Sequence, residues 1–301
     1  MERNPFSIYD FMGYLFPGAL LMYIICYLCG PFDPYNIFDL KDFIQAFHMD
    51  TSIDAYTIGR LAMFVVISYI LGHMVSYLSS LTVELVFRKT FGYPSKYLFS
   101  KSRITWKEMF NNYIASMATV DNKYIKIFVV LLKIMLAIVV SPIMIMNFTL
   151  GHWLGINVFV TRSLDKNLQH IIKEKNNIML KKIKVNPHSK PEDDSHRMVL
   201  HYVYHNIPSS QHKTENYIAL YGFLRAISFI FCIAFDCLLI YAITTIDFDA
   251  AISWKLISEL GILFFVAYIS YLGFTKFYRK YTLENYMALV TDTTLVDKEK
   301  I

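Results

Sequence analysis

Four ionisable side chains fall inside the long apolar runs of this chain, where they are best placed to do chemistry in lipid. They are His73, Lys133, Asp236 and Glu259. A charge near the bilayer centre costs about 2.5 to 3.5 kcal/mol even on lenient insertion scales, so such groups face protein or water. Asp236 is the deepest, and we expect it to pair with Lys133, His73 or a symmetry mate. These residues predict either an interhelical polar lock or part of an ion pathway.

A second candidate is the Ser141-Pro142 pair, which interrupts the apolar stretch 127–160. Residues 127–148 are long enough to cross a hydrocarbon core of about 30 Å as a helix. Proline removes a backbone donor and crowds the preceding turn. Irregular backbone at membrane depth is tolerated where it is buried in protein or lines a wet cavity. The pair therefore predicts either an ordinary kink or a broken, re-entrant or hairpin segment beside a pore.

Basic and histidine side chains gather between residues 161 and 218. LDKNLQHIIKEKNNIMLKKIKV spaces its apolar residues at nearly helical intervals, which predicts a basic amphipathic helix. Its lysine face could hold the phosphates of a nucleotide or an oligonucleotide, or it could lie on anionic lipid. The candidate phosphate-facing residues are Lys166, Lys173, Lys181, Lys182, Lys184, His201 and His205.

Motifs of enzymes and metal sites are missing from the sequence. It has no glycine-rich phosphate loop, no G-x-S-x-G and no paired carboxylates in an aqueous segment. His201 and His205 would share a helix face, but the glutamate of the metalloprotease motif is absent. All cysteines lie inside apolar runs, where a thiol is usually inert. We therefore expect no catalytic residue, metal site, cofactor or disulfide framework.

Composition indicates that these residues belong to a polytopic membrane protein. The 301 residues are 55% hydrophobic, 16% aromatic and 18% charged, which is more apolar and less charged than a soluble domain. Several runs approach the length of a transmembrane helix. We predict an all-α membrane protein with a helical cytoplasmic region and a broken apolar segment at 127–160. Its four firm transmembrane helices are expected at about 11–29, 59–80, 219–246 and 252–274.

Charge distribution predicts the topology. Residues 31–58 hold five acids and one lysine, whereas residues 81–126 hold eight Lys or Arg and three acids. Because basic loops stay in the cytosol, the first loop is external, the second is internal and both termini are cytoplasmic. A single crossing by 127–148 would export the basic segment that follows, so an even number of crossings is preferred. Arg60, Arg225 and Lys255 lie at span ends, where long stems reach the interface.

The predicted organisation follows from these spans. It comprises an N-terminal transmembrane pair with an acidic external loop (1–80), a basic cytoplasmic segment (81–126), the broken apolar segment (127–160), a basic cytoplasmic helical region (161–218), a C-terminal transmembrane hairpin (219–275) and a cytoplasmic tail (276–301).

Four patches of the chain resemble a set of bacterial inner-membrane proteins. They are YDFMGYLFPGALLMY (9–23), YILGHMVSYLSS (69–80), IALYGFLRAISF (218–229) and KFYRKYTLENY (276–286). Members of this set share a Tyr-Asp-x-x-x-Tyr-x-x-Pro-Gly opening and a closing aromatic-Arg-x-Tyr tail, and occur beside nucleotidyltransferases in antiphage loci. The general form is similar to the channel subunit of the Hailong defence system. The resemblance implies an oligomeric channel gated by a nucleotide-derived oligomer, and no functional position is carried over from it.

Together these features predict an oligomeric channel or pore effector of bacterial antiphage defence in the inner (plasma) membrane. We expect a homo-oligomer, with a tetramer as the first guess, gated by a nucleotide signal from a partner nucleotidyltransferase and depolarising the membrane. The alternative is a non-conducting anchor or scaffold that recruits a cytoplasmic partner through residues 161–216. A secondary transporter ranks third, because the sequence has no repeated half.

Overall fold

The fold, seen in a computed structural model, is helical throughout the residues that it describes. These are residues 10–29, 55–99, 123–156, 161–184, 195–245 and 254–295. About 91% of the structure is helix, and the described ranges contain no strand. The predicted all-α class is therefore confirmed. The acidic loop, residues 30–54, and the connection of the C-terminal hairpin, residues 246–253, lie outside the described residues.

The helices follow one another along the chain with two π-helical segments among them. In order they are η1 (Phe11–Leu15), α2 (Phe16–Cys29), α4 (Ala55–Ser79), η2 (Ser80–Glu84), α5 (Leu85–Phe91), α6 (Pro94–Tyr97), α8 (Lys123–Val139), α9 (Ser141–Phe148), α10 (Leu150–Trp153), α12 (Lys166–Lys182), α13 (Ser195–Asn206), α14 (Pro208–Thr245) and α15 (Trp254–Thr291).

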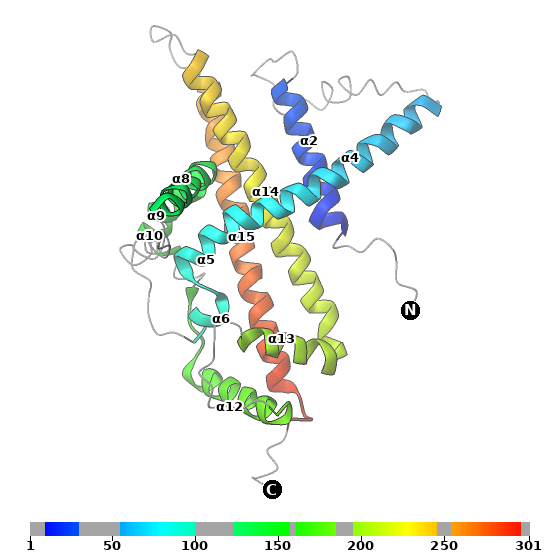
Figure 1. The fold of residues 1–301 in the computed structure, drawn as a ribbon, viewed down its shortest axis with the longest axis vertical. Coiled ribbons are helices and arrows are strands. Elements are labelled where there is room, and N and C mark those ends of the chain that lie inside the picture. Colours follow the sequence, from blue (N-terminus) through cyan, green and yellow to red (C-terminus); the bar gives the residue numbers. More distant parts are fainter. Residues whose placement is uncertain are drawn as a thin grey trace.

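The long pair α14 and α15 forms the axis of the molecule (Figure 1). Each helix has 38 residues, or about 57 Å at 1.5 Å per residue. A hydrocarbon core needs only about 20 helical residues. Each helix is therefore long enough to cross a membrane and extend well beyond it. The helices α2, α4 and α8 surround the upper half of the pair, whereas α12 and α13 lie at its lower end (Figure 1).

Three helical stretches are long and apolar enough to cross a membrane. They are Leu61–Tyr97, Pro208–Thr244 and Trp254–Thr291. A fourth is obtained if α8 and α9 count as one span, although these two helices are bent by 80° at their junction. The first predicted span is helical, but its apolar helix, Phe11–Ile25, is shorter than these three. The structure thus agrees with a membrane protein.

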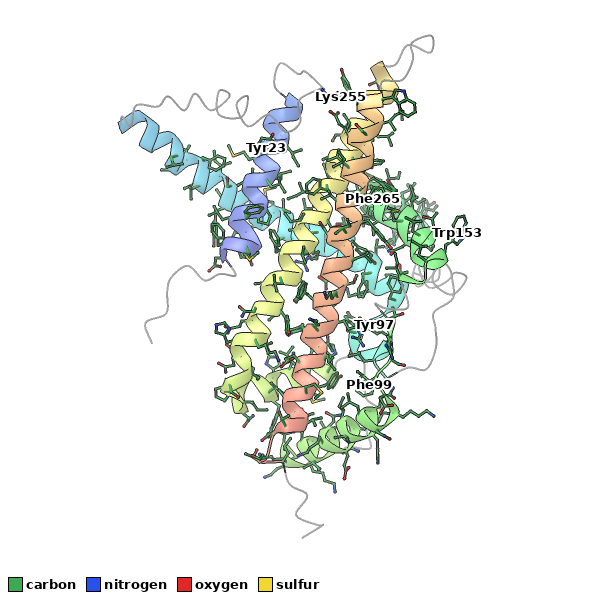
Figure 2. All side chains as sticks on the ribbon, turned by 180° about the vertical axis from the view of Figure 1, so that it is seen from behind. Tyr23, Tyr97, Phe99, Trp153, Lys255 and Phe265 are labelled. Carbon is green, nitrogen blue, oxygen red and sulfur yellow. The ribbon has the colours of Figure 1, made fainter. Side chains whose placement is uncertain are left out.

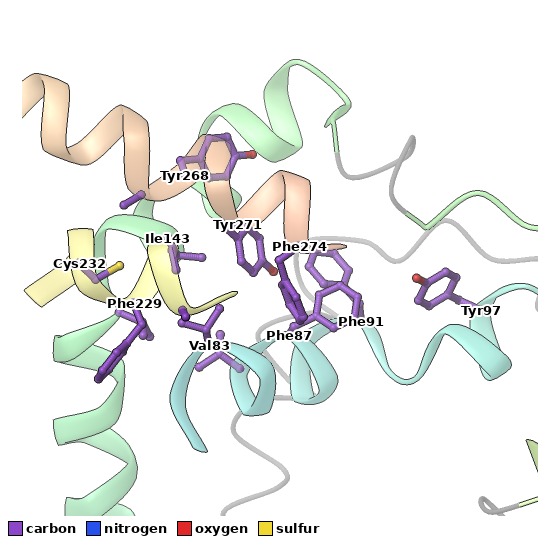
Figure 3. Packing of buried hydrophobic residues seen from close by; sticks show 14 of the residues in the cluster. Val83, Phe87, Phe91, Tyr97, Ile143, Phe229, Cys232, Tyr268, Tyr271 and Phe274 are labelled. Atoms are coloured by element: carbon purple, nitrogen blue, oxygen red, sulfur yellow. The ribbon is translucent and has the colours of Figure 1, made fainter. Parts of the chain in front are cut away.

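Aromatic side chains pack α5 against the middle of α15 (Figure 3). Phe87 is fully buried, with its ring centroid 5.6 Å from that of Phe274 and 6.4 Å from that of Tyr271. Such edge-to-face pairs contribute about 0.5 to 1.5 kcal/mol each beyond the burial of their area. This packing fixes the end of the α4–η2–α5 helix on the central pair.

Small residues let the N-terminal helices cross at backbone contact. A Cβ atom at Gly18 of α2 would overlap the carbonyl of Ser68 in α4, and one at Gly72 would overlap the carbonyl of Tyr14. Helices in lipid associate mainly through close van der Waals packing, for which glycine and serine are suited. The second predicted span therefore packs against the first apolar helix through glycine contacts.

Large apolar side chains remain uncovered on the upper half of the chain. On α8 these are Ile127, Phe128, Leu131, Leu132, Ile134, Met135 and Ile138, and α4 exposes a similar set. Trp153 projects away from α10, and Phe265 and Lys255 lie on the upper part of α15 (Figure 2). Contiguous apolar surface of this extent is typical of contact with lipid or with another protein.

Candidate functional site

The break between α8 and α9 is tied to α14 by a hydrogen bond. The Ser141 hydroxyl donates to Oδ1 of Asp236 at 3.3 Å. The break follows from Pro142, which is buried in the first turn of α9 and has no N–H to continue the helix of α8. The structure therefore joins two predicted features, the deepest carboxylate and the interrupted segment. An ordinary proline kink was the alternative, and the 80° angle favours the broken segment.

His73, one of the three partners expected for Asp236, makes its described ring contacts elsewhere. The imidazole of His73 stacks on Tyr14, with 3.8 Å between ring centroids, and meets Tyr69 edge-on at 4.7 Å. His73 thus belongs to the contact between η1 and α4. The side chain of Lys133 lies outside the described residues, so its part in the prediction is untested. Glu259 is buried in α15, with 8% of its surface exposed.

Arg225 of α14 makes an ion pair that the sequence analysis missed. Its guanidinium is paired with the carboxylate of Glu84 in η2. It also donates to the Ser79 hydroxyl at 3.1 Å and to the Ser76 carbonyl at 3.2 Å. The side chains of Arg225 and Glu84 are only 11% and 17% exposed. The expectation that Arg225 extends to the interface is therefore wrong, because its head group turns inward to another helix.

The ion pair forms at the π-helical turn of η2, which contains Glu84. A π-helix bonds residues five apart instead of four, which displaces backbone groups from the regular helical ladder, and such turns are frequent at functional sites. The Ser76 carbonyl, just before η2, accepts bonds from both the Ser79 hydroxyl and Arg225. The second span was expected to end near residue 80, but its helix continues through Glu84. An acidic residue so close to the end of an apolar run was the signal in the sequence.

A polar cluster at the lower end joins α12 and α13 to the segment after α15. Tyr202 of α13 donates to Oδ2 of Asp292 at 2.9 Å and accepts from Lys182 of α12 at 3.2 Å. The Lys175 ammonium donates to the carbonyls of Asp292 and Leu295, at 3.1 and 2.8 Å. These bonds satisfy backbone acceptors at the end of α15. The lower helices are therefore attached to the central pair by specific contacts.

Asp292 is held in its charged form within this cluster. Desolvation by itself would raise its pKa. Hydrogen bonds from Thr294 and Tyr202, together with the charge of Lys182, outweigh that effect, and the pKa is lowered from the ordinary value. The cluster consequently contains a charged carboxylate that accepts hydrogen bonds and lies within the electrostatic influence of Lys182. Nothing in the sequence distinguished Asp292 from other acids of the tail.

The seven predicted phosphate-facing residues separate into three groups. Lys182 is bonded within the cluster around Asp292. Four others have exposed side chains on the outer face of α12 or just after it: Lys166, Lys173, Lys181 and Lys184. Residues seven apart share a helix face, so Lys166 and Lys173 form a basic stripe, which we call the lysine stripe. The apolar residues Ile172 and Met179 are buried on the opposite face.

His201 and His205 form the third group and line a cavity. Both are exposed on α13, which is helical as their spacing predicted. The cavity lies between α13, the start of α14 and the lower part of α15, and its volume is about 380 Å³. No group of three or more potential metal ligands occurs within the described ranges. The geometry thus separates the histidines from the lysine stripe.

Comparison with protein-family models, with curated proteins and with solved structures finds no match.

Proposed function

We propose that this chain is the subunit of a homo-oligomeric channel or pore effector in the bacterial inner membrane, with both termini cytoplasmic. The lower helical region faces the cytosol and receives an anionic, nucleotide-derived signal. Conduction through the upper half depolarises the membrane in antiphage defence. An assembly of four copies remains the first expectation.

One observation carries this proposal: α14 connects the lower region to two polar contacts between helices in the upper half. Its first turn lies beside the cavity, Arg225 meets Glu84 further along, and Asp236 meets Ser141 near its upper part. A helix of 38 residues without a break acts as a rigid element. A displacement of its lower end therefore changes the contact at the break between α8 and α9, where irregular backbone could line a wet path.

The lysine stripe supports binding of an anionic ligand. Lys166 and Lys173 are exposed on one face of α12, whose opposite face is packed against the lower part of α15. Each phosphate that a lysine neutralises releases counterions, so binding should weaken steeply with salt. Because α12 is bonded to the end of α15, a ligand on its outer face can bias the position of the central pair.

The positions of the helix ends support the proposed orientation. The joined ends of α2 and α4, and those of α14 and α15, lie toward the upper side of the molecule, while α12 and α13 lie at the opposite end (Figure 1). The segments that join these upper ends are the acidic ones, residues 30–54 and 246–253. The basic helices lie at the lower end, so the positive-inside rule assigns the lower end to the cytosol.

Recording from purified protein in planar bilayers tests the proposal. We expect unitary currents that respond to short synthetic DNA or RNA oligonucleotides. Lys173→Glu should shift that response to higher ligand concentration. Lys89→Glu, the same charge reversal at an exposed position of α5, should leave it unchanged. Asp236→Asn should alter the unitary current or its gating. Silence with every oligonucleotide, together with a stoichiometric soluble partner in pull-downs, would instead favour the anchor.

A further inference from the structure

One face of α15 changes from apolar to basic partway along the helix. Residues three or four positions apart lie on the same side of a helix. The upper part of this face exposes three large apolar side chains, and its lower part exposes two lysines. In order, the five residues are Ile262, Phe265, Ile269, Lys276 and Lys280. We call this surface the α15 face.

The length of the α15 face matches the thickness of a bilayer. Lys255 lies on the same side of the helix, 21 positions before Lys276. At 1.5 Å per residue, the two lysines are about 32 Å apart along the axis, which is close to the hydrocarbon thickness of about 30 Å. Lys255 and the exposed Phe265 both lie on the upper part of the helix (Figure 2). The α15 face therefore leaves the lipid near Lys276.

Aromatic rings hold the two lower lysines together at this boundary. The ammonium nitrogens of Lys276 and Lys280 each lie 5.8 Å from the ring centroid of Phe277. That of Lys280 is also 6.0 Å from the ring centroid of Tyr217 in α14. A cation over a ring face is attracted to it. Two positive charges are thus gathered around one ring, at the level where a bilayer has its head groups.

The charges of these lysines are not neutralised by the described part of the chain. Neither Lys276 nor Lys280 forms an ion pair there. The next acid along the helix is Glu284, one turn below Lys280, and its carboxylate is bound by Lys213 at 2.6 Å. The lower end of the α15 face therefore has a positive charge that is available to an anion.

We propose that the α15 face binds an anionic phospholipid in the leaflet at the lower end of the molecule. An acyl chain lies along Ile269, and the head group meets Lys276 and Lys280. Basic residues at a membrane surface attract anionic lipid. A phospholipid fits both parts of the face, whereas a free phosphate would leave the apolar part uncovered. The proposal requires that α15 spans a bilayer, and it is independent of conduction and of the lysine stripe.

Quenching of a single tryptophan by brominated lipids tests the proposal. Trp106, Trp153 and Trp254 are changed to phenylalanine, and Ile269→Trp places one reporter on the α15 face, about 10 Å above Lys276. The full chain is reconstituted with brominated phosphatidylglycerol or brominated phosphatidylcholine in unlabelled phosphatidylcholine. The quenching gives the relative affinity of the two lipids at the reporter. We expect phosphatidylglycerol to be preferred about tenfold at low salt.

Two double variants of the reporter protein separate local charge from total charge. Lys276→Gln with Lys280→Gln should remove most of the preference, about threefold to fivefold for each lysine. Lys166→Gln with Lys173→Gln removes the same charge from the lysine stripe and should leave the preference unchanged. Quenching by brominated phosphatidylcholine should be the same in all three proteins, because the reporter still faces lipid.

Four results would overturn the proposal. The first is equal quenching of the reporter by the two brominated lipids, and the second is an equal effect of the two double variants. The third is a reporter that brominated phosphatidylcholine does not quench, because the α15 face would then lie outside the lipid. The fourth concerns the source of the phosphate. Sodium phosphate should lower the preference no more than sodium chloride of the same ionic strength, and a larger loss would assign the lysines to free phosphate.

Discussion

Replacing Arg225 with methionine should remove the cation that joins α14 to the η2 turn. Its guanidinium bonds to Glu84, to the Ser79 hydroxyl and to the Ser76 carbonyl. Methionine keeps much of the length of the side chain and supplies no donor. Among the described residues, Glu84 would then have one cationic partner left, Arg88, whose Nε lies 3.8 Å from Oε1 of Glu84.

The expected cost is about 3 kcal/mol. Removing one partner of a buried ion pair costs about 3 to 5 kcal/mol, because an uncompensated charge is left behind. We expect the lower end of that range, since Arg88 offsets part of the loss and both partners keep some exposure. Adding Glu84→Met to Arg225→Met removes the stranded carboxylate and should recover part of the stability.

Unfolding can be followed by the reaction of buried thiols with a fluorogenic maleimide. Cys232 is buried in α14, whereas Cys237 is half-buried. Cys26, Cys29 and Cys237 should therefore be changed to serine so that they add no signal. The matched control is Lys213→Met, which breaks an ion pair with Glu284 at 2.6 Å, where the lysine side chain is 58% exposed. Because water already solvates that lysine, its loss should leave the midpoint unchanged within error.

The comparison between the two variants decides the outcome. If Arg225→Met lowers the unfolding midpoint no more than Lys213→Met does, the inward ion pair contributes nothing to stability. The assignment of Arg225 as a helix-joining residue would then be wrong.

Three other predictions follow from the packing and the lower cluster. Gly72→Ala should separate η1 from α4 and lower stability by about 1 to 3 kcal/mol, measured as above, whereas Gly222→Ala, with open space at its Cβ, should not. Asp292→Asn should cost about 1 kcal/mol. Because the pKa of Asp292 is lowered in the folded state, this difference should be constant above about pH 4 and disappear as the pH falls through that pKa. Pro142→Ala should lengthen the spin-label distance between the arms of α8 and α9, and an unchanged distance would assign the bend to packing.

The helical class and the basic amphipathic helix could be predicted because both depend on local periodicity. Alternation of lysines with apolar residues over 164–185 predicted the helix α12 and which of its faces is buried. Apolar runs predicted the helices that contain the second and the last two spans. The proline in the middle of the third run predicted a break at the position where α8 ends.

The ends of the helices could not be predicted from hydropathy. The second span was expected to stop near residue 80, but its helix continues through η2 and α5. The last two helices extend well beyond their apolar parts, because their lower halves are stabilised by α12 and α13. Hydropathy indicates where a helix leaves the lipid. How far the helix continues outside the lipid depends on the tertiary packing that stabilises it there.

The candidate site was partly predictable. Asp236, Ser141 and Pro142 were chosen separately, as an intramembrane charge and as an interrupted backbone, and the structure brings the first two into contact. His201 and His205 were chosen with the lysines and instead line a cavity apart from the lysine stripe. Residue type thus indicated which side chains are unusual, and did not indicate which of them meet.

The sequence by itself determined the class of this protein, because apolar length, charge distribution and helical period are properties of neighbouring residues. Only the tertiary structure decided the partners. Ser141 and Asp236 are 95 positions apart, and Arg225 and Glu84 are 141 positions apart. Such pairings depend on how whole helices cross, which is set by glycine contacts and aromatic packing. No local pattern in one sequence encodes that geometry.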